Sequence, residues 1–230
     1  MSRLILPDLL RTIAILFMVI YHIVFDLTVF WGWDVGIYER GWWFIARSAA
    51  ALFLLTSGLT DAIPRKHRDL RRFLILAGCA VLISIATIPL GHDVFIKFGI
   101  LHLMAVASLL IILFRKLPSL LVSTIGIVII LTGFTIGTPS TSLPWLFPFG
   151  WITPEFASLD YFPLIPWFGW ILLGRGVATS LLTWIPTSYH HSTRVTTIIL
   201  FPGRHSLLLY MIHQPIIIAI LMWILGNPRF

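Results

Sequence analysis

The chain has 230 residues, of which 58% are hydrophobic and only 11% are charged, against about 45–50% and about 25% in ordinary soluble domains. Its 16 Lys and Arg and 9 Asp and Glu residues are too few to solvate a soluble surface of this size. This composition excludes a soluble enzyme and a disordered chain, and the single Cys79 excludes a disulfide-stapled scaffold. We therefore expect a polytopic membrane protein.

Long apolar runs recur along the chain. A hydrocarbon core of about 30 Å requires about 20 helical residues, and none of the runs alternates as a barrel strand would. They predict an all-α transmembrane bundle of about seven spanning helices, forming a single domain over residues 1–230. The predicted helices cover residues 8–31, 42–60, 72–90, 98–114, 119–137, 162–182 and 204–225.

The net charge of +7 is concentrated in short loops between the apolar runs. The linker DAIPRKHRDLRR (residues 61–72) is the strongest cluster of Lys and Arg, and such clusters mark cytoplasmic loops. We therefore place the N-terminus inside and the C-terminus outside. Among Lys and Arg, only Arg40, Arg47, Lys97 and Arg229 then lie outside. Because the positive charge follows this topology, we do not expect nucleic-acid binding.

Two segments are expected to be irregular. Residues 137–166 contain repeated prolines, which forbid a long continuous helix, and we interpret them as an outer loop of the kind that forms lids or binding surfaces. Residues 183–203 include the apolar stretch 195–201, which is too short to span and which we interpret as interfacial on the inner face. Most Trp residues fall at predicted outer ends, and this excess suggests a surface that stacks on carbohydrate.

The first predicted helix carries several ionisable side chains at membrane depth. Such residues are functional candidates because their burial is costly. Arg11 and His22 are three helical turns apart, so they share a face and lie about 16 Å apart along the axis. Asp8 is one turn before Arg11, and Asp26 is one turn after His22. An interfacial ion pair and an interhelical hydrogen bond would explain these residues, but the stripe also suits an Arg for phosphate and a His–Asp general base.

Two more histidines lie at membrane depth, His102 in KFGILHLMAV and His213 in LLLYMIHQP. Each histidine either stabilises the bundle through a hydrogen bond or is a catalytic group. Together with His22 they leave open a b-type haem protein, although no ligand pattern or carboxylate-rich metal set accompanies them. Arg175 and Arg204, each beside a glycine near the predicted inner face, are candidate anion ligands. We expect no metal site.

The segment DLLRTIAILFMVIYHIVFDL resembles the opening helix of integral membrane acyltransferases, in which an Arg and a His with ten residues between them mark the catalytic helix. The chain is more similar to prokaryotic relatives of the heparan-α-glucosaminide N-acetyltransferase catalytic family. This resemblance continues through ARSAAALFLLTSGLT, KFGILHLMAVASLL, LDYFPLIPWFGWILLGRGVA and GRHSLLLYMIHQPIIIAIL, and it therefore spans nearly the whole chain.

The resemblance implies a multi-pass enzyme of the cell membrane. Such an enzyme transfers an acyl group, usually acetyl, from cytoplasmic acyl-CoA to a hydroxyl or amine of a glycan or other envelope acceptor on the far side. It implies that His22 is the base or acyl carrier, that Asp26 orients it, and that Arg11 contacts CoA. In the lysosomal enzyme of this family a His in the first non-cytoplasmic loop serves catalysis, but the loop WGWDVGIYERG here contains none.

These assignments give one hypothesis for the whole reaction path across the lipid bilayer. The residues assigned to catalysis are His22, Asp26 and Arg11; those assigned to the cosubstrate acetyl-CoA or another acyl-CoA are Arg11, Arg175, Arg204 and His213; those assigned to the acceptor are His102, Asp160 and Tyr161. A homodimer is implied only by analogy with the eukaryotic enzyme. The competing hypothesis is a proton-coupled small-molecule transporter or flippase without acyl transfer. The sequence names neither the acceptor nor the acyl length.

Overall fold

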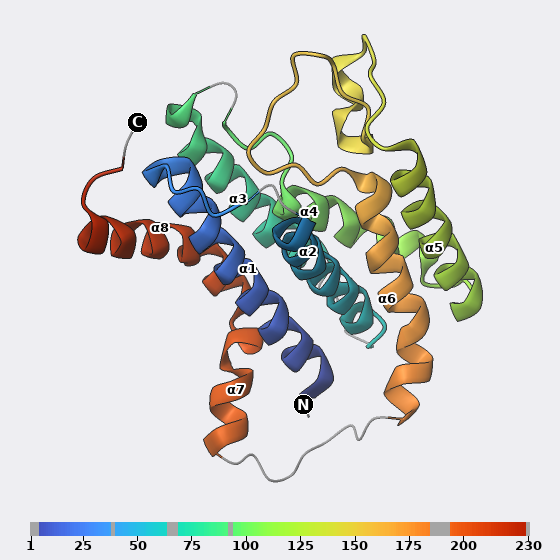
Figure 1. Cartoon of the computed structure of the whole chain (residues 1–230). Helices are drawn as coiled ribbons and strands as arrows, with labels where there is room; N and C mark the ends of the chain where they lie inside the picture. Colours follow the sequence, from blue (N-terminus) through green and yellow to red (C-terminus); the bar gives the residue numbers. More distant parts are fainter. Residues whose placement is uncertain (1–4, 38–39, 64–68, 92–93, 185–193, 229–230) are drawn as a thin grey trace. The chain divides into compact units, whose positions relative to one another are not determined.

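The computed structural model describes residues 5–37, 40–63, 69–91, 94–184 and 194–228. Within these ranges the chain is helical and has no named strand, only two isolated bridges. This confirms the all-helical prediction (Figure 1). The helices are α1 (Ile5–Trp31), α2 (Arg40–Asp61), α3 (Asp69–Thr87), α4 (Ile100–Leu110), α5 (Ser119–Ile136), α6 (Leu164–Trp184), α7 (Arg194–Arg204) and α8 (Ser206–Leu225), with the short 3-10 segments η1 (Ile88–Leu90), η2 (Ile111–Phe114) and η3 (Pro144–Phe149).

Five helices of the described chain are long and apolar enough to cross a membrane. They are Ile5–Trp31, Gly41–Asp61, Asp69–Leu90, Ser119–Ile136 and Ser206–Leu225. Two shorter apolar helices, Ile100–Phe114 and Leu164–Ala178, occupy the other two predicted spans, so a total of seven spans stays a prediction. The orientation also stays a prediction, since Arg65, Lys66 and Arg68 of its strongest signal lie outside the described residues.

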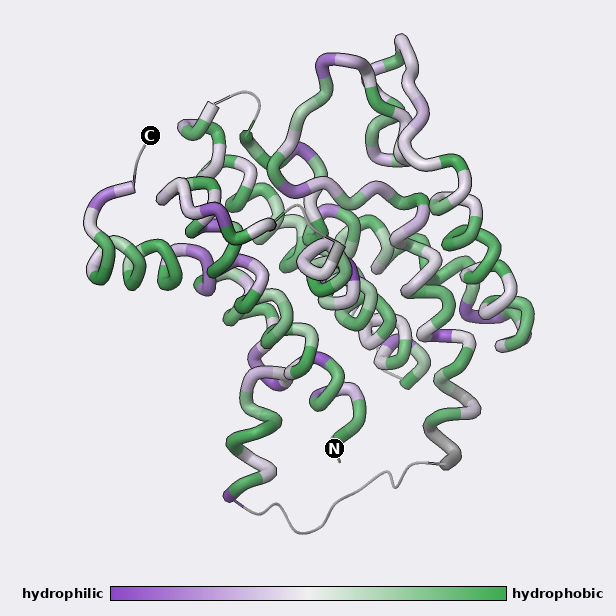
Figure 2. Tube along the Cα trace, viewed as in Figure 1, coloured by the Kyte–Doolittle hydropathy of each residue, from purple (hydrophilic) through white to green (hydrophobic). Residues whose placement is uncertain are grey.

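The outer faces of the helices are apolar. Leu74 and Val81 of α3 are 58% and 53% exposed, Leu120 of α5 is 79% exposed, and Trp223 of α8 is 85% exposed. Hydrophobic residues run along most of the length of these helices (Figure 2). Such surfaces are unusual on a monomer in water. In a bilayer they face lipid, because a helix satisfies its backbone polar groups internally.

Contacts between residues divide the chain into two compact units, each described here by itself. Unit 1 contains Met1–Phe53 and Ile185–Phe230, and unit 2 contains Leu54–Trp184. The prediction of a single domain is not decided by this grouping and stays a prediction.

In unit 1, α7 packs on the first half of α1. The hydroxyl of Thr12 is 3.1 Å from the carbonyl oxygen of Ile199 and accepts a 3.0 Å hydrogen bond from the amide of Gly203. A Cβ at Gly203 would collide with the backbone of Asp8, so the two helices approach closely there. The segment predicted as interfacial is therefore a regular helix held by its polar backbone groups as well as by apolar contacts.

The second half of α1 packs on α8. Trp31 forms an apolar cluster with Ile217 and Leu221, and its indole Nε1 donates a 3.2 Å hydrogen bond to the carbonyl of Gly226. Because the start of α8 follows the contact with Asp8 and its end meets Trp31, α8 runs in the same sense as α1. That both helices cross a membrane, and in the same direction, stays a prediction.

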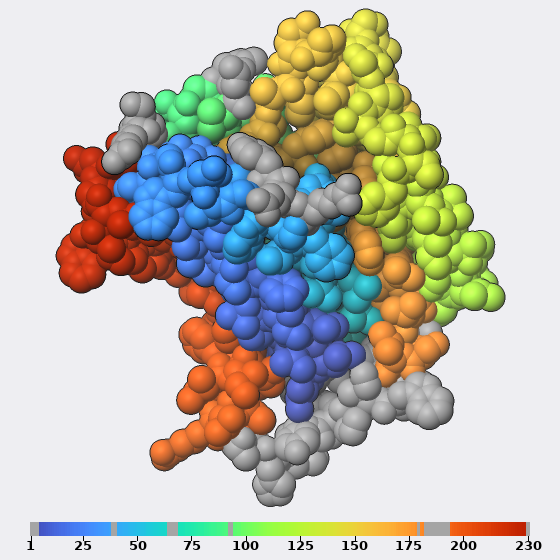
Figure 3. Space-filling model, in the orientation of Figure 1, coloured from blue at the N-terminus to red at the C-terminus, as the bar shows by residue number. Residues whose placement is uncertain are grey.

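Unit 2 is built on close helix contacts at glycines. A Cβ at Gly126 or Gly133 of α5 would collide with α6, and α6 is seen directly beside α5 in Figure 3. The end of α2 approaches α6 in the same way: a Cβ at Gly174 would meet the backbone of Leu55, and one at Gly58 would meet the carbonyl of Ile171. Small residues permit such approach between membrane helices.

We predict that Gly174→Ala destabilises the protein, because the new methyl group has no space beside the Leu55 carbonyl. Overpacking of this kind costs about 1–3 kcal/mol. The matched control is Gly78→Ala in the middle of α3, where a Cβ meets nothing within 4 Å and Ala is favoured over Gly by about 1 kcal/mol. Thermal unfolding in detergent measures both, and equal midpoints for the two variants would contradict the packing described.

Candidate functional site

Four polar side chains of α1 and α8 meet inside unit 1. The ring centroids of His22 and His213 are 4.8 Å apart, with the rings edge to face at 80°. Asp26 is completely buried, and its Oδ1 accepts a 2.6 Å hydrogen bond from Nε2 of Gln214. We call His22, Asp26, His213 and Gln214 the histidine centre. It brings together three predicted site residues and one, Gln214, that the sequence analysis missed.

The hydrogen bonds of the two imidazoles fix their tautomers. Nδ1 of His22 is 2.8 Å from the carbonyl oxygen of Met18, and Nδ1 of His213 is 2.6 Å from that of Tyr210. A carbonyl oxygen only accepts, so Nδ1 carries the proton in each ring. Each neutral imidazole therefore presents a lone pair at Nε2, the atom that can act as base or nucleophile.

The expected hydrogen bond between His22 and Asp26 is not formed in this structure. His22 is oriented by the carbonyl of Met18, one turn earlier on its own helix, while Asp26 is bound to Gln214 on α8. The reason is local geometry: the preceding turn offers His22 a carbonyl, and the Asp26 carboxylate finds its donor on the neighbouring helix. The edge-to-face contact of the two rings also leaves no space for a haem between them.

A pair of arginines surrounds Asp8 near the start of α1. Nη1 of Arg11 is 3.6 Å from Oδ1 of Asp8, and Nε of Arg204 is 3.6 Å from its Oδ2. The structure thus brings together two of the predicted acyl-CoA ligands from α1 and α7. Distances of 3.6 Å are beyond those of a good hydrogen bond, so Asp8 holds these cations loosely. The pair lies about 16 Å along α1 from His22.

Arg175 lies in unit 2, within a different and much tighter ion network. Its Nη1 donates a 2.6 Å hydrogen bond to Oδ2 of Asp61, and its Nη2 donates to the carbonyl of Arg115 at 3.2 Å. The Arg115 guanidinium bridges Asp61 and Asp69 with hydrogen bonds of 2.6 to 3.3 Å. The hydrogen bonds that Arg115 donates to Asp69 and Asp61 raise the pKa of Arg115 above its ordinary value. The network joins α2, α3, η2 and α6.

His102 has a structural environment at the start of α4. Its Nδ1 accepts a 3.2 Å hydrogen bond from the amide of Gly99, so its Nε2 carries the proton and faces the Ser84 hydroxyl at 3.2 Å. That hydroxyl donates to the carbonyl of Ile96 at 2.6 Å. Both ring nitrogens are thus engaged in capping the helix and fastening the loop before it.

Asp160 and Tyr161 lie beside the same helix start as His102. Oδ2 of Asp160 accepts a 3.2 Å hydrogen bond from the amide of Ile100. The hydroxyl of Tyr161 donates a 2.6 Å hydrogen bond to the carbonyl of Phe147, and burial raises its pKa to about 12. The three residues predicted for the acceptor are therefore neighbours, but the structure uses their polar atoms to hold the loop.

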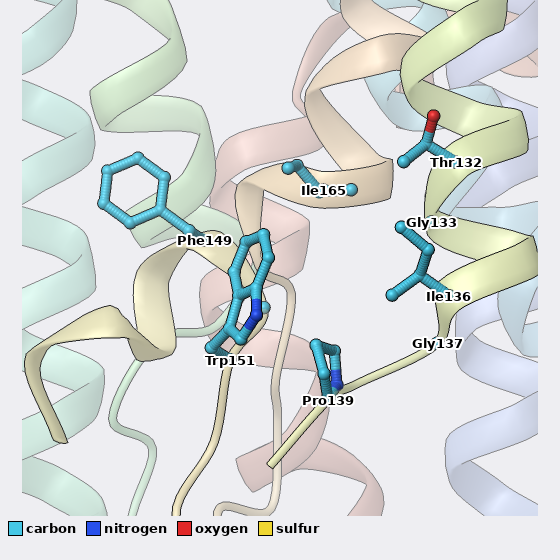
Figure 4. A pocket seen from close by; sticks show the side chains of 9 residues that line it. Thr132, Gly133, Ile136, Gly137, Pro139, Phe149, Trp151 and Ile165 are labelled. Carbon is cyan, nitrogen blue, oxygen red and sulfur yellow. The ribbon is translucent and has the colours of Figure 1, made fainter. Parts of the chain in front are cut away.

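A shallow recess lies between the end of α5 and the loop before α6. It encloses about 250 Å³ and includes open solvent. Its lining is mostly apolar, with Phe149 and Trp151 on the side across from Ile136 (Figure 4). It contains none of the predicted site residues.

Residues 3–215 match a protein family described as heparan-alpha-glucosaminide N-acetyltransferase, catalytic. The matched range includes the whole histidine centre and the arginine pair. No curated protein and no solved structure gives a significant match to the chain.

We predict that Asp61→Asn destabilises the protein by about 3–5 kcal/mol, the usual cost of removing one partner of a buried ion pair. The Asp61 side chain is only 4% exposed and forms ion pairs with both Arg115 and Arg175. The matched control is Asp69→Asn, whose side chain is 40% exposed and whose loss costs less than about 1 kcal/mol. Thermal unfolding compares the two, and an equal effect would show that Asp61 does not hold the network.

Proposed function

The chain belongs to the heparan-alpha-glucosaminide N-acetyltransferase catalytic family, and we propose that it is a membrane acyltransferase that moves an acetyl group from cytoplasmic acyl-CoA to a hydroxyl or amine on the far side. The observation that carries the proposal is the contact of His22 with His213, whose ring centroids are 4.8 Å apart. In each ring Nδ1 bonds a carbonyl of its own helix, so Nε2 carries the lone pair. The arginine pair at the start of α1 supplies a matching anion site.

The donor binds at Arg11 and Arg204. Guanidinium groups form bidentate hydrogen bonds with phosphate oxygens, and Asp8 brings the guanidinium groups of Arg11 and Arg204 together at 3.6 Å from its two oxygens. The first amides of α8, directly after Arg204, add partial positive charge. The pantetheine arm then spans about 16 Å to bring the thioester to His22.

At the histidine centre, Nε2 of His22 removes the acceptor's proton or takes the acyl group and passes it on. A hydrogen bond to Met18 keeps the ring from turning away. The acceptor is an envelope glycan or another hydroxyl- or amine-bearing molecule. Exposed Trp33 and Trp43 of unit 1 offer ring faces on which a sugar can stack.

Binding of the donor tests the proposal most directly. The purified full chain is heated with CoA, acetyl-CoA and longer acyl-CoAs, and acetyl-CoA at 100 times its Kd is expected to stabilise the fold by about 2.7 kcal/mol. Transfer is then measured with labelled acetyl-CoA and methyl α-glucosaminide as probe acceptor. Absence of stabilisation by every acyl-CoA would contradict the proposal and favour a transporter.

We predict that Arg11→Gln and Arg204→Gln each weaken acetyl-CoA binding about 10- to 100-fold, since a hydrogen bond to a charged group contributes about 1.5–3 kcal/mol. The matched control is Arg194→Gln at the other end of α7, where the side chain is exposed and distant from Asp8 along the helix. Acetyl-CoA-dependent thermal stabilisation measures all three. An equal loss in Arg194→Gln would assign the effect to overall charge.

We predict that His22→Asn lowers kcat about 10²- to 10⁴-fold, the usual contribution of a general base. The Asn amide keeps an N–H for the Met18 carbonyl but removes the Nε2 lone pair. Stabilisation by acetyl-CoA is expected to be unchanged, which separates chemistry from donor binding. A folded variant with full transfer activity would remove His22 from the mechanism.

A further inference from the structure

We propose that the dipeptide His213–Gln214 of α8 completes the proposed transfer site: His213 is the catalytic base that takes the proton of the acceptor, and Gln214 is a positioning residue for Asp26. This inference rests on the proposed acyl transfer and extends it to a second helix. It divides the chemistry between two imidazoles, so that His22 is left to hold the acyl group or the thioester.

The tautomers of the two rings support this division. Each Nδ1 is tied by its proton to a carbonyl of its own helix, so each ring has a single lone pair, at Nε2. If Nε2 of His22 carries the acyl group, that ring has no lone pair left for a proton. His213 lies 4.8 Å away, centroid to centroid, and is the second imidazole of the centre.

Three buried atoms of the centre have no hydrogen-bond partner within the described residues: Oδ2 of Asp26, Nε2 of His213 and Oε1 of Gln214. All three are acceptors, given the tautomer of His213 and the amide orientation that donates to Asp26. Buried acceptors are nearly always paired, so the missing partner is a molecule that brings donors. The O–H or N–H groups of an acyl acceptor are such donors.

Gln214 connects these atoms. Its Nε2 donates a 2.6 Å hydrogen bond to Oδ1 of the completely buried Asp26. This bond joins α8 to α1 one residue after His213, which lies against His22, and it leaves Oδ2 of Asp26 without a partner among the described residues. Gln214 therefore acts on the reacting groups through Asp26.

The X–H bond of the acceptor breaks and its proton passes to Nε2 of His213, while X forms a bond with the acyl carbonyl carbon. The bond from that carbon to the CoA sulfur breaks in direct transfer, or the bond to Nε2 of His22 breaks if the acyl group was first carried there. The electron pair stays with the sulfur or returns to Nε2. The His213 imidazolium finally protonates the CoA thiolate, so that acyl-CoA and X–H become acyl–X and CoA–SH.

The test compares His213→Asn with His205→Asn in the full chain, using labelled acetyl-CoA and methyl α-glucosaminide. Asn at position 213 keeps an N–H for the Tyr210 carbonyl and removes only the Nε2 lone pair. His205 is a matched control, because its Nδ1 makes the same kind of contact with the Phe201 carbonyl at 3.1 Å while its side chain is exposed. We expect kcat to fall about 10²- to 10⁴-fold in the first variant, with KM for acetyl-CoA unchanged, and no change in the second.

Addition of imidazole to His213→Ala separates a chemical from a structural role. Recovery of transfer supports His213 as the base, whereas a folded variant that imidazole does not restore overturns it. The base role of His213 is also overturned if the His213→Asn variant transfers acetyl within about threefold of the wild-type rate while acetyl-CoA stabilises it as much as the wild type. That outcome leaves the proposed function intact. A wild-type chain that neither binds acetyl-CoA nor releases CoA thiol overturns the proposed function itself, and this inference with it.

The positioning role is tested by combining Gln214→Leu with Asp26→Asn. If Gln214 acts through its bond to Asp26, the two single variants and the double variant share about the same reduced kcat, with KM for acetyl-CoA unchanged. Losses that multiply in the double variant would show that Gln214 acts independently of Asp26.

Discussion

The hydrogen bond from Gln214 to Asp26 joins α8 to α1 at the level of the two histidines. A carboxyl group that is completely buried between apolar helices is costly unless a donor meets it. Asp26 therefore constrains which face of α8 packs on α1, and the adjacent residue, His213, then lies against His22. The Trp31 cluster fixes the same packing further along both helices. The Asp26–Gln214 hydrogen bond sets the rotation of α8 about its own axis, and the apolar contacts supply most of the packing energy between the two helices.

The carboxylates of Asp61 and Asp8 each contact two arginines, but at different distances. Asp61 meets Arg115 and Arg175 at 2.6 Å and closes one end of unit 2. Asp8 meets Arg11 and Arg204 only at 3.6 Å. A short, bidentate network resists exchange and suits a structural role, whereas the proposed donor site is assigned to the pair with the longer contacts. Distance, rather than residue type, separates the two arginine sites.

Hydropathy and helical periodicity were sufficient for the long apolar helices and for the shared face of Arg11 and His22, because both depend only on local geometry. They missed the helix α7, which lies in a segment that was expected to be irregular. They did not reveal the role of Gln214, an uncharged residue whose importance comes from a contact with α1. Nor did they reveal that Asp61 takes up Arg175, since the two are far apart in the sequence. Which helix faces which depends on packing that involves glycines such as Gly58 and Gly174, and a single sequence does not show such pairs.

The interval between Arg11 and His22 on α1 has a consequence for how a donor is selected. α1 carries both Arg11 and His22, so its helical rise sets an interval of about 16 Å along the axis between the arginine pair and the imidazoles. In the proposed reaction, the pantetheine arm between the phosphates and the thioester has to match this interval. A small acyl phosphate has no such arm and would reach only one of the two proposed sites, so the proposed reaction would favour a long carrier over a short activated acid.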